Sequence, residues 1–179
     1  AELTVEGARV TVREKKLKTL WTVGEKVILQ DLSLSFTSGQ TCAVMGPSGA
    51  GKTTFLDFLA LENRGVQQTG DVRLNGKQLT FKRFKKHCAY VPQDDSGWPH
   101  LSCRETLQYS ASLFGPRVKG GRVDELIITM GLESCQNQLV GNVFLKGLSG
   151  GQKRRMNLAE ALLREPVAIF LDEVTSGLD

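Results

Sequence analysis

The sequence is poor in the residues that build disulfide scaffolds and structural zinc sites. Its 179 residues include four cysteines and two histidines, and no two cysteines form a C-x-x-C pair. A zinc site is therefore not expected. Single, scattered cysteines are typical of a reducing compartment, so we predict a chain that faces the cytosol.

Long hydrophobic runs are also missing. A membrane-spanning helix needs about 18 consecutive apolar residues, whereas one of the longest apolar runs here is 167–171. The first residues do not combine a charged region with an apolar one, so no signal peptide is expected. With 40% hydrophobic and 23% charged residues, the composition excludes disorder and collagen. It is typical of a soluble globular domain that does not itself cross a bilayer.

Cations are in slight excess, with 23 Lys and Arg against 19 Asp and Glu and a net charge of +4. This bias suits an anionic partner but does not distinguish among a nucleotide, a nucleic acid and a membrane surface. One basic run, 82–86, has Phe84 in its middle. Because no nucleic-acid-binding module surrounds it, we interpret the run as the solvated face of a helix and expect no nucleic acid partner.

Hydrophobic patterning predicts a β-rich N-terminal part followed by alternating strands and helices. Period-two alternation predicts strands within 2–36, and Asn75-Gly76 predicts a hairpin turn. The nearly all-apolar segment 41–45 predicts a strand covered on both faces, as in a parallel sheet. Further strands are predicted at 71–74, 77–79, 88–91 and 167–171, and helices at 52–62, 103–114, 122–130 and 149–164.

A glycine-rich segment lies between a predicted strand and a predicted helix. It fits the pattern G-x-x-x-x-G-K-[ST] in full, with Gly46, Pro47, Ser48, Gly49, Ala50, Gly51, Lys52 and Thr53. The glycines let backbone N–H groups surround a phosphate, and the helix N-terminus adds partial positive charge. Lys52 can bridge β- and γ-phosphates, and the Thr53 hydroxyl can ligate Mg²⁺. A chance match by a glycine-rich turn is on the order of one per cent, so we predict a phosphate-binding loop.

Two acids, Asp172 and Glu173, follow the predicted buried strand 167–171. Parallel sheets bind ligands at the carboxyl ends of their strands, so we expect both carboxylates in the same crevice as Lys52. Asp172 would hold Mg²⁺ through water, and Glu173 could act as the general base toward an attacking water. Considered alone, two solvated acids capping a strand would be an equally good interpretation. Downstream of a phosphate-binding loop, the catalytic interpretation is favoured.

The segment 148–152 has the sequence Leu-Ser-Gly-Gly-Gln and begins a predicted helix about twenty residues before the two acids. Ser149 is a natural N-cap, and Gly150 and Gly151 leave the helix N-terminus open to an anion. With these three segments in this order, the chain resembles the ATP-binding cassette (ABC) family. The matches are Walker A at 46–53, the signature at 148–152, Walker B at 168–173 and the D-loop at 176–179. Gln93, after the predicted strand 88–91, matches the Q-loop glutamine.

The resemblance implies an α/β fold of the P-loop NTPase type, with an N-terminal antiparallel β part and a helical signature-motif insert. It implies one ABC ATPase domain over 1–179, with its core at 1–93 and 165–179, its insert at about 94–164, and an incomplete C-terminus. ATP and Mg²⁺ are the implied ligands. The residues implied for the nucleotide are 46–53 with Thr54, and those for the metal are Thr53, Gln93 and Asp172; Glu173, Gln93 and Lys52 are the implied catalytic residues.

The resemblance also implies a second ABC ATPase domain that packs head to tail with the first, as a homodimer or a heterodimer. Each ATP would lie between one Walker A and the partner's signature. The residues that would act on the partner's ATP are Ser149, Gly150, Gly151 and Gln152, with Asp179 in the D-loop. ATP binding would close the dimer, and its motion would drive a transmembrane domain at the cytoplasmic face of a membrane.

Within the family, the chain is most similar to the G subfamily, of the White/eye-pigment and pleiotropic-drug type. The similarity lies in 91–95, Pro99, 104–107, 131–135 and 140–142. It implies export of lipids, sterols or xenobiotics. The chain departs from the subfamily's pattern in having Val174 where a proline is usual, and in Gln152 and Lys153 where Glu and Arg are frequent.

Two tryptophans have expected roles. Trp21, upstream of Walker A, is predicted to stack on adenine, with a partly exposed surface residue as the alternative. Trp98 is expected to contact the membrane domain. Two other functions stay open: a soluble ABC-type ATPase in translation or DNA repair, and a nucleotide-binding module without hydrolysis, against which Glu173 argues.

Overall fold

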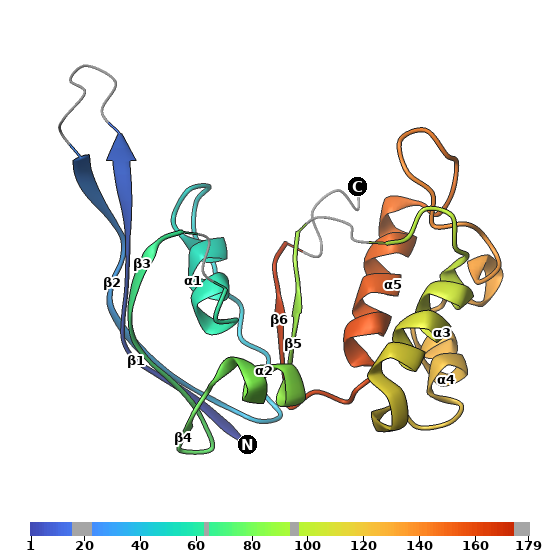
Figure 1. Cartoon of the computed structure of the whole chain (residues 1–179), viewed down its shortest axis with the longest axis horizontal. Coiled ribbons are helices and arrows are strands. Elements are labelled where there is room, and N and C mark those ends of the chain that lie inside the picture. Colours follow the sequence, from blue (N-terminus) through green and yellow to red (C-terminus); the bar gives the residue numbers. More distant parts are fainter. Residues whose placement is uncertain (16–22, 63–64, 94–96, 174–179) are drawn as a thin grey trace. The chain divides into compact units, whose positions relative to one another are not determined.

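The structure is a computed structural model that describes residues 1–15, 23–62, 65–93 and 97–173. The chain divides into two compact units, Ala1–Cys88 and Ala89–Asp179, and each is described by itself. Figure 1 shows the elements of both units. In the part that the structure describes, no helix is both long and apolar enough to cross a membrane.

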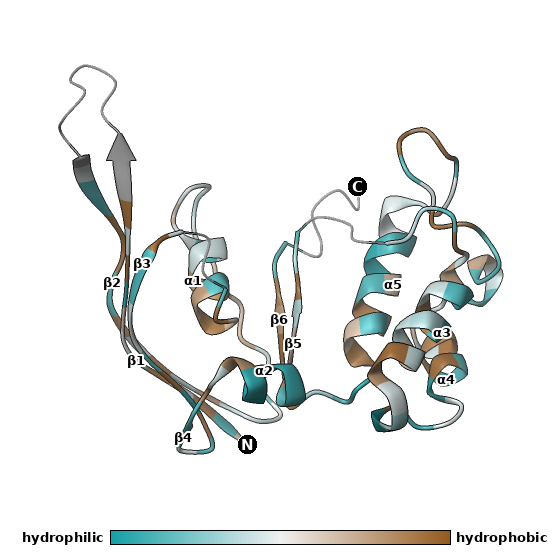
Figure 2. Ribbon diagram, viewed as in Figure 1, coloured by the Kyte–Doolittle hydropathy of each residue, from teal (hydrophilic) through white to brown (hydrophobic). Residues whose placement is uncertain are grey.

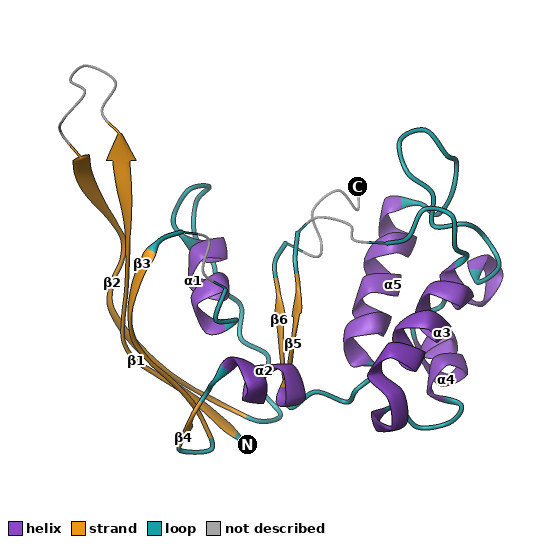
Figure 3. Ribbon diagram, viewed as in Figure 1, coloured by secondary structure: helices purple, strands orange, loops and turns teal. Residues whose placement is uncertain are grey.

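The described residues of the first unit form an antiparallel sheet of four strands in the order β2-β1-β3-β4 (Figure 3). The strands are β1 (Glu2–Lys15), β2 (Val23–Thr37), β3 (Gln67–Leu74) and β4 (Lys77–Gln78). Leu3 of β1 pairs with Phe36 on one side and Leu74 on the other. The turn from β3 to β4 has positive φ at Asn75 and Gly76 (53° and 70°). The predicted N-terminal β part and its hairpin are therefore confirmed.

One face of this sheet contributes to a hydrophobic core with the first helix, α1 (Lys52–Leu59). The buried residues of β1 and of α1 are Leu3, Val5, Ala8, Val10, Phe55, Phe58 and Leu59. Leu3 and Val5, and then Ala8 and Val10, follow the period of two by which strand side chains alternate between faces, and the phase changes between Val5 and Ala8, where the pairing register with β2 shifts. The core fixes α1, and with it the glycine-rich loop that immediately precedes the helix.

The basic run forms a short helix, α2 (Phe81–His87), capped by the Thr80 side chain, which accepts a hydrogen bond from the backbone of Arg83. Phe84 is buried, whereas Lys82, Lys85 and Lys86 are exposed. This arrangement agrees with a solvated helix face that is attached by one aromatic side chain.

In its described residues, the second unit contains three longer helices and two short paired strands. The helices are α3 (Cys103–Phe114), α4 (Arg122–Thr129) and α5 (Gly150–Leu162), with 3₁₀ turns η1 (Gly115–Arg117) and η2 (Glu133–Cys135). The strands are β5 (Cys88–Val91) and β6 (Ala168–Leu171). Figure 2 shows the hydrophobic residues of both strands. The fully buried side chains that join the helices include Leu107, Leu126, Ile127, Leu132, Met156 and Leu163.

Two predictions about the first unit were wrong. The segment 41–45 is not a strand, and its side chains are exposed, with Met45 at 88%. A strand needs a neighbour for its backbone hydrogen bonds, and no described strand of the sheet pairs with 41–45. Helix 52–62 is also shorter than predicted: α1 ends at Leu59, and Leu61 has a φ of 58°, which is incompatible with a continuing helix.

Candidate functional site

The glycine-rich loop 46–53 owes its shape to two glycines with left-handed backbone, Gly49 (φ 78°) and Gly51 (φ 91°). At Gly51 a Cβ atom would lie 3.0 Å from Cγ2 of Ile28, so space as well as φ favours glycine there. Gly51 is the N-cap of α1, and the first turn of that helix contains no acid. An anion at the positive dipole end of α1 would therefore meet no repulsion from an acid in that turn.

The Lys52 amine is folded back over this loop. Its Nζ donates to the backbone oxygens of Gly46 (2.9 Å) and Pro47 (3.0 Å). The loop thus holds the cation above its own backbone, at the position where phosphate oxygens could replace the two carbonyl acceptors. Thr53 and Thr54 follow in the first turn of α1. The loop fits a phosphate group, because it brings together a cation, a helix N-terminus and glycine backbone.

In the second unit, the carboxyl ends of β5 and β6 lie together. The backbone N–H of Asp172, just after β6, donates to the carbonyl of Val91, the last residue of β5 (3.0 Å). Gln93 and Glu173 therefore leave neighbouring strand ends, and Nε2 of Gln93 donates to Oε2 of Glu173 (2.7 Å). Glu173 has a φ of 46°, a conformation that few non-glycine residues adopt. Such backbone conformations are frequent at functional sites.

The two acids differ in environment although they are adjacent. Asp172 is 3% exposed, whereas the Glu173 carboxylate is exposed. The buried acid is therefore held close to the strand ends, and the exposed one can be reached by water. Among the described residues, no cluster of three or more His, Cys, Asp or Glu side chains could hold a metal ion. A single carboxylate still fits Mg²⁺ at a nucleotide, since this ion is usually bound by one or two carboxylates together with phosphates and water.

The segment 148–152 begins α5 with a capping box. Oγ of Ser149 accepts from the backbone N–H of Gln152 (3.3 Å), and Oε1 of Gln152 accepts from the backbone N–H of Ser149 (2.8 Å). Ser149 and Gly150 are exposed. The N-cap predicted for Ser149 is thereby confirmed, and a second helix N-terminus without an acid in its first turn faces solvent.

Comparison with known proteins identifies the family. The family described as ABC transporter matches residues 29–176 of the chain. The chain belongs to the ABC transporter family. It is the nucleotide-binding domain of an ABC transporter, a type of domain that hydrolyses ATP.

Curated relatives confirm the predicted resemblance to the G subfamily. The chain is 43% identical to ABC transporter G family member 1 of Dictyostelium discoideum over 96% of its length. It is 41% identical to ABC transporter G family member 25 of Arabidopsis thaliana over 87% of its length, and 38% identical to ABC transporter G family member STR of Medicago truncatula over 94%. The matches cover 22%, 24% and 21% of these relatives, so the chain spans between a fifth and a quarter of their length.

The structure brings some of the predicted site residues of this ABC domain together and leaves others separate. Gln93, Asp172 and Glu173 meet at the strand ends of the second unit, while Lys52 belongs to the first unit, so the crevice expected to hold them all stays a prediction. Trp21 and Asp179 lie outside the described residues.

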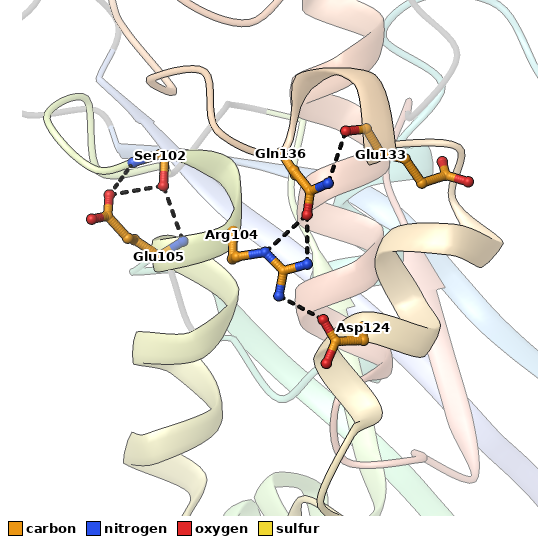
Figure 4. A network of polar contacts seen from close by, with 6 residues as sticks. All are labelled: Ser102, Arg104, Glu105, Asp124, Glu133 and Gln136. Atoms are coloured by element: carbon orange, nitrogen blue, oxygen red, sulfur yellow. Dashed lines mark hydrogen bonds and ion pairs between the residues drawn. The ribbon is translucent and has the colours of Figure 1, made fainter.

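Sequence reasoning missed the polar contacts that hold the helices in place. Arg104, in the first turn of α3, donates from Nε (2.8 Å) to Oε1 of Gln136, and it forms an ion pair with Asp124 of α4 (Figure 4). Beside it, Ser102 caps α3, and the pKa of Glu105 is lowered because the Ser102 backbone N–H and then its hydroxyl donate to the carboxylate. No spacing in the sequence indicates the bond to Gln136, because the partners are 32 residues apart.

Arg154 of α5 was also missed. Its guanidinium donates to the backbone oxygen of Gln93, 61 residues earlier. Residues 153–155 are all cationic, so nothing in the sequence distinguished Arg154 from its two neighbours. Lys153 donates instead to the carbonyl of Gly141 (3.1 Å).

Proposed function

We propose that this domain binds Mg·ATP through residues 46–54 and hydrolyses it with Glu173 as the general base. The observation that carries the proposal is the bond from Gln93 to Glu173, because it places an amide and an exposed carboxylate together beside the buried Asp172. In a site that receives a γ-phosphate, this group of side chains suits the activation of water.

Binding begins at the loop. Backbone N–H groups of 46–53 would surround the β-phosphate, and Lys52 would exchange its two carbonyl acceptors for phosphate oxygens. This exchange replaces two neutral acceptors with charged ones, so it favours the bound state. Trp21 is proposed to stack on the adenine ring.

Hydrolysis is proposed to need Gln93, Asp172 and Glu173 of the second unit as well as Thr53 of the first. The Thr53 hydroxyl, the Gln93 amide and the Asp172 carboxylate would hold Mg²⁺, which supplies charge neutralisation on the phosphates when bound. Glu173 would then take the proton of the attacking water. Because one carboxylate oxygen accepts from Gln93, the other oxygen is the one proposed to face the water.

The complete catalytic unit is proposed to be a dimer. The first turn of α5 contains no acid, and Ser149 and Gly150 at its start are exposed, which suits an anion from outside the chain. Ser149, Gly150, Gly151 and Gln152 would therefore contact the ATP of a second ABC domain, homologous or identical, with Asp179 at the same interface.

We further propose that ATP-driven closure of this dimer powers a transmembrane domain at the cytoplasmic face, for export of lipids, sterols or xenobiotics. One surface suits contact with that domain. Trp98, which precedes α3, and Tyr109 of α3 form an edge-to-face pair with ring centroids 5.8 Å apart, and both residues are about half exposed (55% and 46%). Exposed aromatic pairs of this kind are frequent in protein–protein interfaces.

The proposal is tested in the full-length protein with Lys52→Ala and Glu173→Gln. Lys52→Ala should lose most of the ATP affinity measured by calorimetry, because the phosphates lose their cation. Glu173→Gln should keep ATP affinity and lose about 10²- to 10⁴-fold in hydrolysis rate, as removal of a general base usually does. It should also accumulate an ATP-bound dimer, seen as earlier elution in size-exclusion chromatography.

Two exposed residues, Lys82 and Glu133, provide matched controls. Lys82→Ala and Glu133→Gln make the same chemical changes away from the site, and both should retain binding and hydrolysis. Unchanged nucleotide affinity in Lys52→Ala would refute the assignment of residues 46–54 as the ATP-binding loop. Near wild-type hydrolysis in Glu173→Gln would rule out the general-base role.

A further inference from the structure

A continuous set of contacts joins the helix that follows the signature to the carboxylate of Glu173. Arg154 lies on α5, five residues after Ser149, and its guanidinium donates to the backbone oxygen of Gln93. The Gln93 side chain in turn donates to Oε2 of Glu173 (2.7 Å). All three residues belong to the second unit.

The segment that carries Gln93 contacts α5 a second time at Gly97. A Cβ atom at this position would lie 2.5 Å from Cγ1 of Val140 and 3.1 Å from Cε of Met156. The Gly97 backbone therefore packs directly against Met156 of α5, which is itself fully buried. Gln93 and Gly97 are thus both held by α5, one through a cationic hydrogen bond and the other through close packing.

We propose that Arg154 is a positioning residue that holds Gln93 against Glu173 and thereby orients the carboxylate for hydrolysis. The inference rests on the proposed role of Glu173 as general base. The Glu173 side chain is exposed and has three rotatable bonds, so a single hydrogen bond from Gln93 restricts it only if the amide itself is fixed. The guanidinium of Arg154 holds the Gln93 backbone, from which that amide extends, and it is well suited to do so because it stays charged at all relevant pH values and its planar donors have defined directions.

The arrangement also gives the N-cap and the second turn of α5 different tasks. Its N-terminus carries Ser149, which is proposed to meet the partner's ATP, and its next turn carries Arg154, which holds the Gln93 of the same chain. A displacement of α5 caused by nucleotide at one site would therefore shift the base of the other site. We infer that Arg154 couples the two ATP sites of the dimer.

The test compares Arg154→Ala and Arg154→Lys with Lys153→Ala in the full-length protein. Lys153 is a matched control, since it is the neighbouring cation on α5 and also donates to a backbone carbonyl, that of Gly141. Arg154→Ala should lower kcat by roughly 10²-fold, the effect of misplacing a catalytic group by about 1 Å. The ATP affinity should stay within about twofold of wild type, because the loop 46–53 is untouched. The coupling of the two ATP sites should weaken, which would be measured as a smaller Hill coefficient for ATP. Arg154→Lys should restore part of kcat, and Lys153→Ala should hydrolyse ATP at the wild-type rate.

A double-mutant cycle tests whether Arg154 affects hydrolysis through Gln93. If Arg154 acts through the Gln93 amide, Arg154→Ala should have no further effect on kcat in a Gln93→Ala background. An additive loss in the double variant would overturn the proposal, and so would a wild-type kcat in folded Arg154→Ala. A parallel loss of kcat, ATP affinity and thermal stability would mean that Arg154 is merely structural, which also overturns it. Should Arg154→Ala not fold, the same cycle is run with Arg154→Lys.

Failure of this inference can be separated from failure of the proposed function. If Glu173→Gln still hydrolyses ATP, the general-base assignment is wrong, whatever Arg154 does. If Glu173→Gln is inactive while folded Arg154→Ala is fully active, only the positioning role of Arg154 is wrong.

Discussion

Ser149 allows the stability of α5 and the chemistry of the signature to be separated. Ser149→Ala removes the hydroxyl that accepts from the backbone N–H of Gln152 (3.3 Å). The reciprocal bond from the Ser149 backbone to Oε1 of Gln152 (2.8 Å) does not need that hydroxyl. One of the two capping bonds is therefore lost. Loss of a serine cap costs about 1 kcal/mol. Because Ser149 itself is exposed, water can hydrate the backbone that loses its cap, so we expect no larger cost.

Hydrogen exchange measures this cost locally. About 1 kcal/mol corresponds to roughly fivefold faster exchange where opening of the first turn limits the rate. The effect should be confined to the amides of 150–154, and Ser149→Thr should largely restore protection because it keeps a capping hydroxyl. Gln152→Ala removes the reciprocal bond and serves as a second comparison. Unchanged exchange in Ser149→Ala would refute the capping argument, whereas a loss of hydrolysis far beyond fivefold would indicate a further role of the hydroxyl at the partner's ATP.

Two further predictions concern the second unit. Gly141→Ala should destabilise the protein by more than about 2 kcal/mol, because φ is +67° and the new Cβ would lie 2.4 Å from the Leu145 backbone oxygen. Gly131→Ala is the control for backbone strain alone, since Gly131 has a φ of +60° and open space around it. Equal losses of unfolding free energy in the two variants, measured by denaturant unfolding, would contradict the clash. Burial raises the pKa of Cys103 to about 11 and also raises the pKa of Cys135. Both thiols should therefore stay protonated at pH 8 and react slowly with maleimide in the native protein. Native labelling as fast as labelling in urea, measured by mass spectrometry, would contradict this.

Local signals in the sequence predicted many of the elements, because their cause lies within a few residues. The Asn75-Gly76 turn follows from the tolerance of both residues for positive φ. The start of α5 follows from the Ser149 cap. The glycine-rich loop could be placed before α1, and its lysine at the start of that helix, for the same reason, since the left-handed glycine at 51 directly precedes the helix.

Features that depend on distant partners could not be predicted in this way. The apolar composition of 41–45 indicated a buried strand, but strand formation also requires a neighbour, and none of the described strands in its unit pairs with it. The bonds of Arg104 to Gln136 and of Arg154 to Gln93 span 32 and 61 residues. Nothing in the local pattern distinguishes these arginines from other surface cations, because only the packing of the helices brings their acceptors within reach.

The residues of the candidate site share one structural property that explains this division. Lys52 and Ser149 lie at helix N-termini, and Gln93 and Glu173 each lie two residues beyond a strand end. The position of each residue in its element is therefore set locally, by where the helix starts or the strand stops. Their mutual contacts are set by tertiary packing: Gln93 meets Glu173 because β5 and β6 end together, and Arg154 reaches Gln93 because Met156 anchors α5 in the helical core. Changes in that packing can therefore alter hydrolysis without altering any residue that touches the nucleotide.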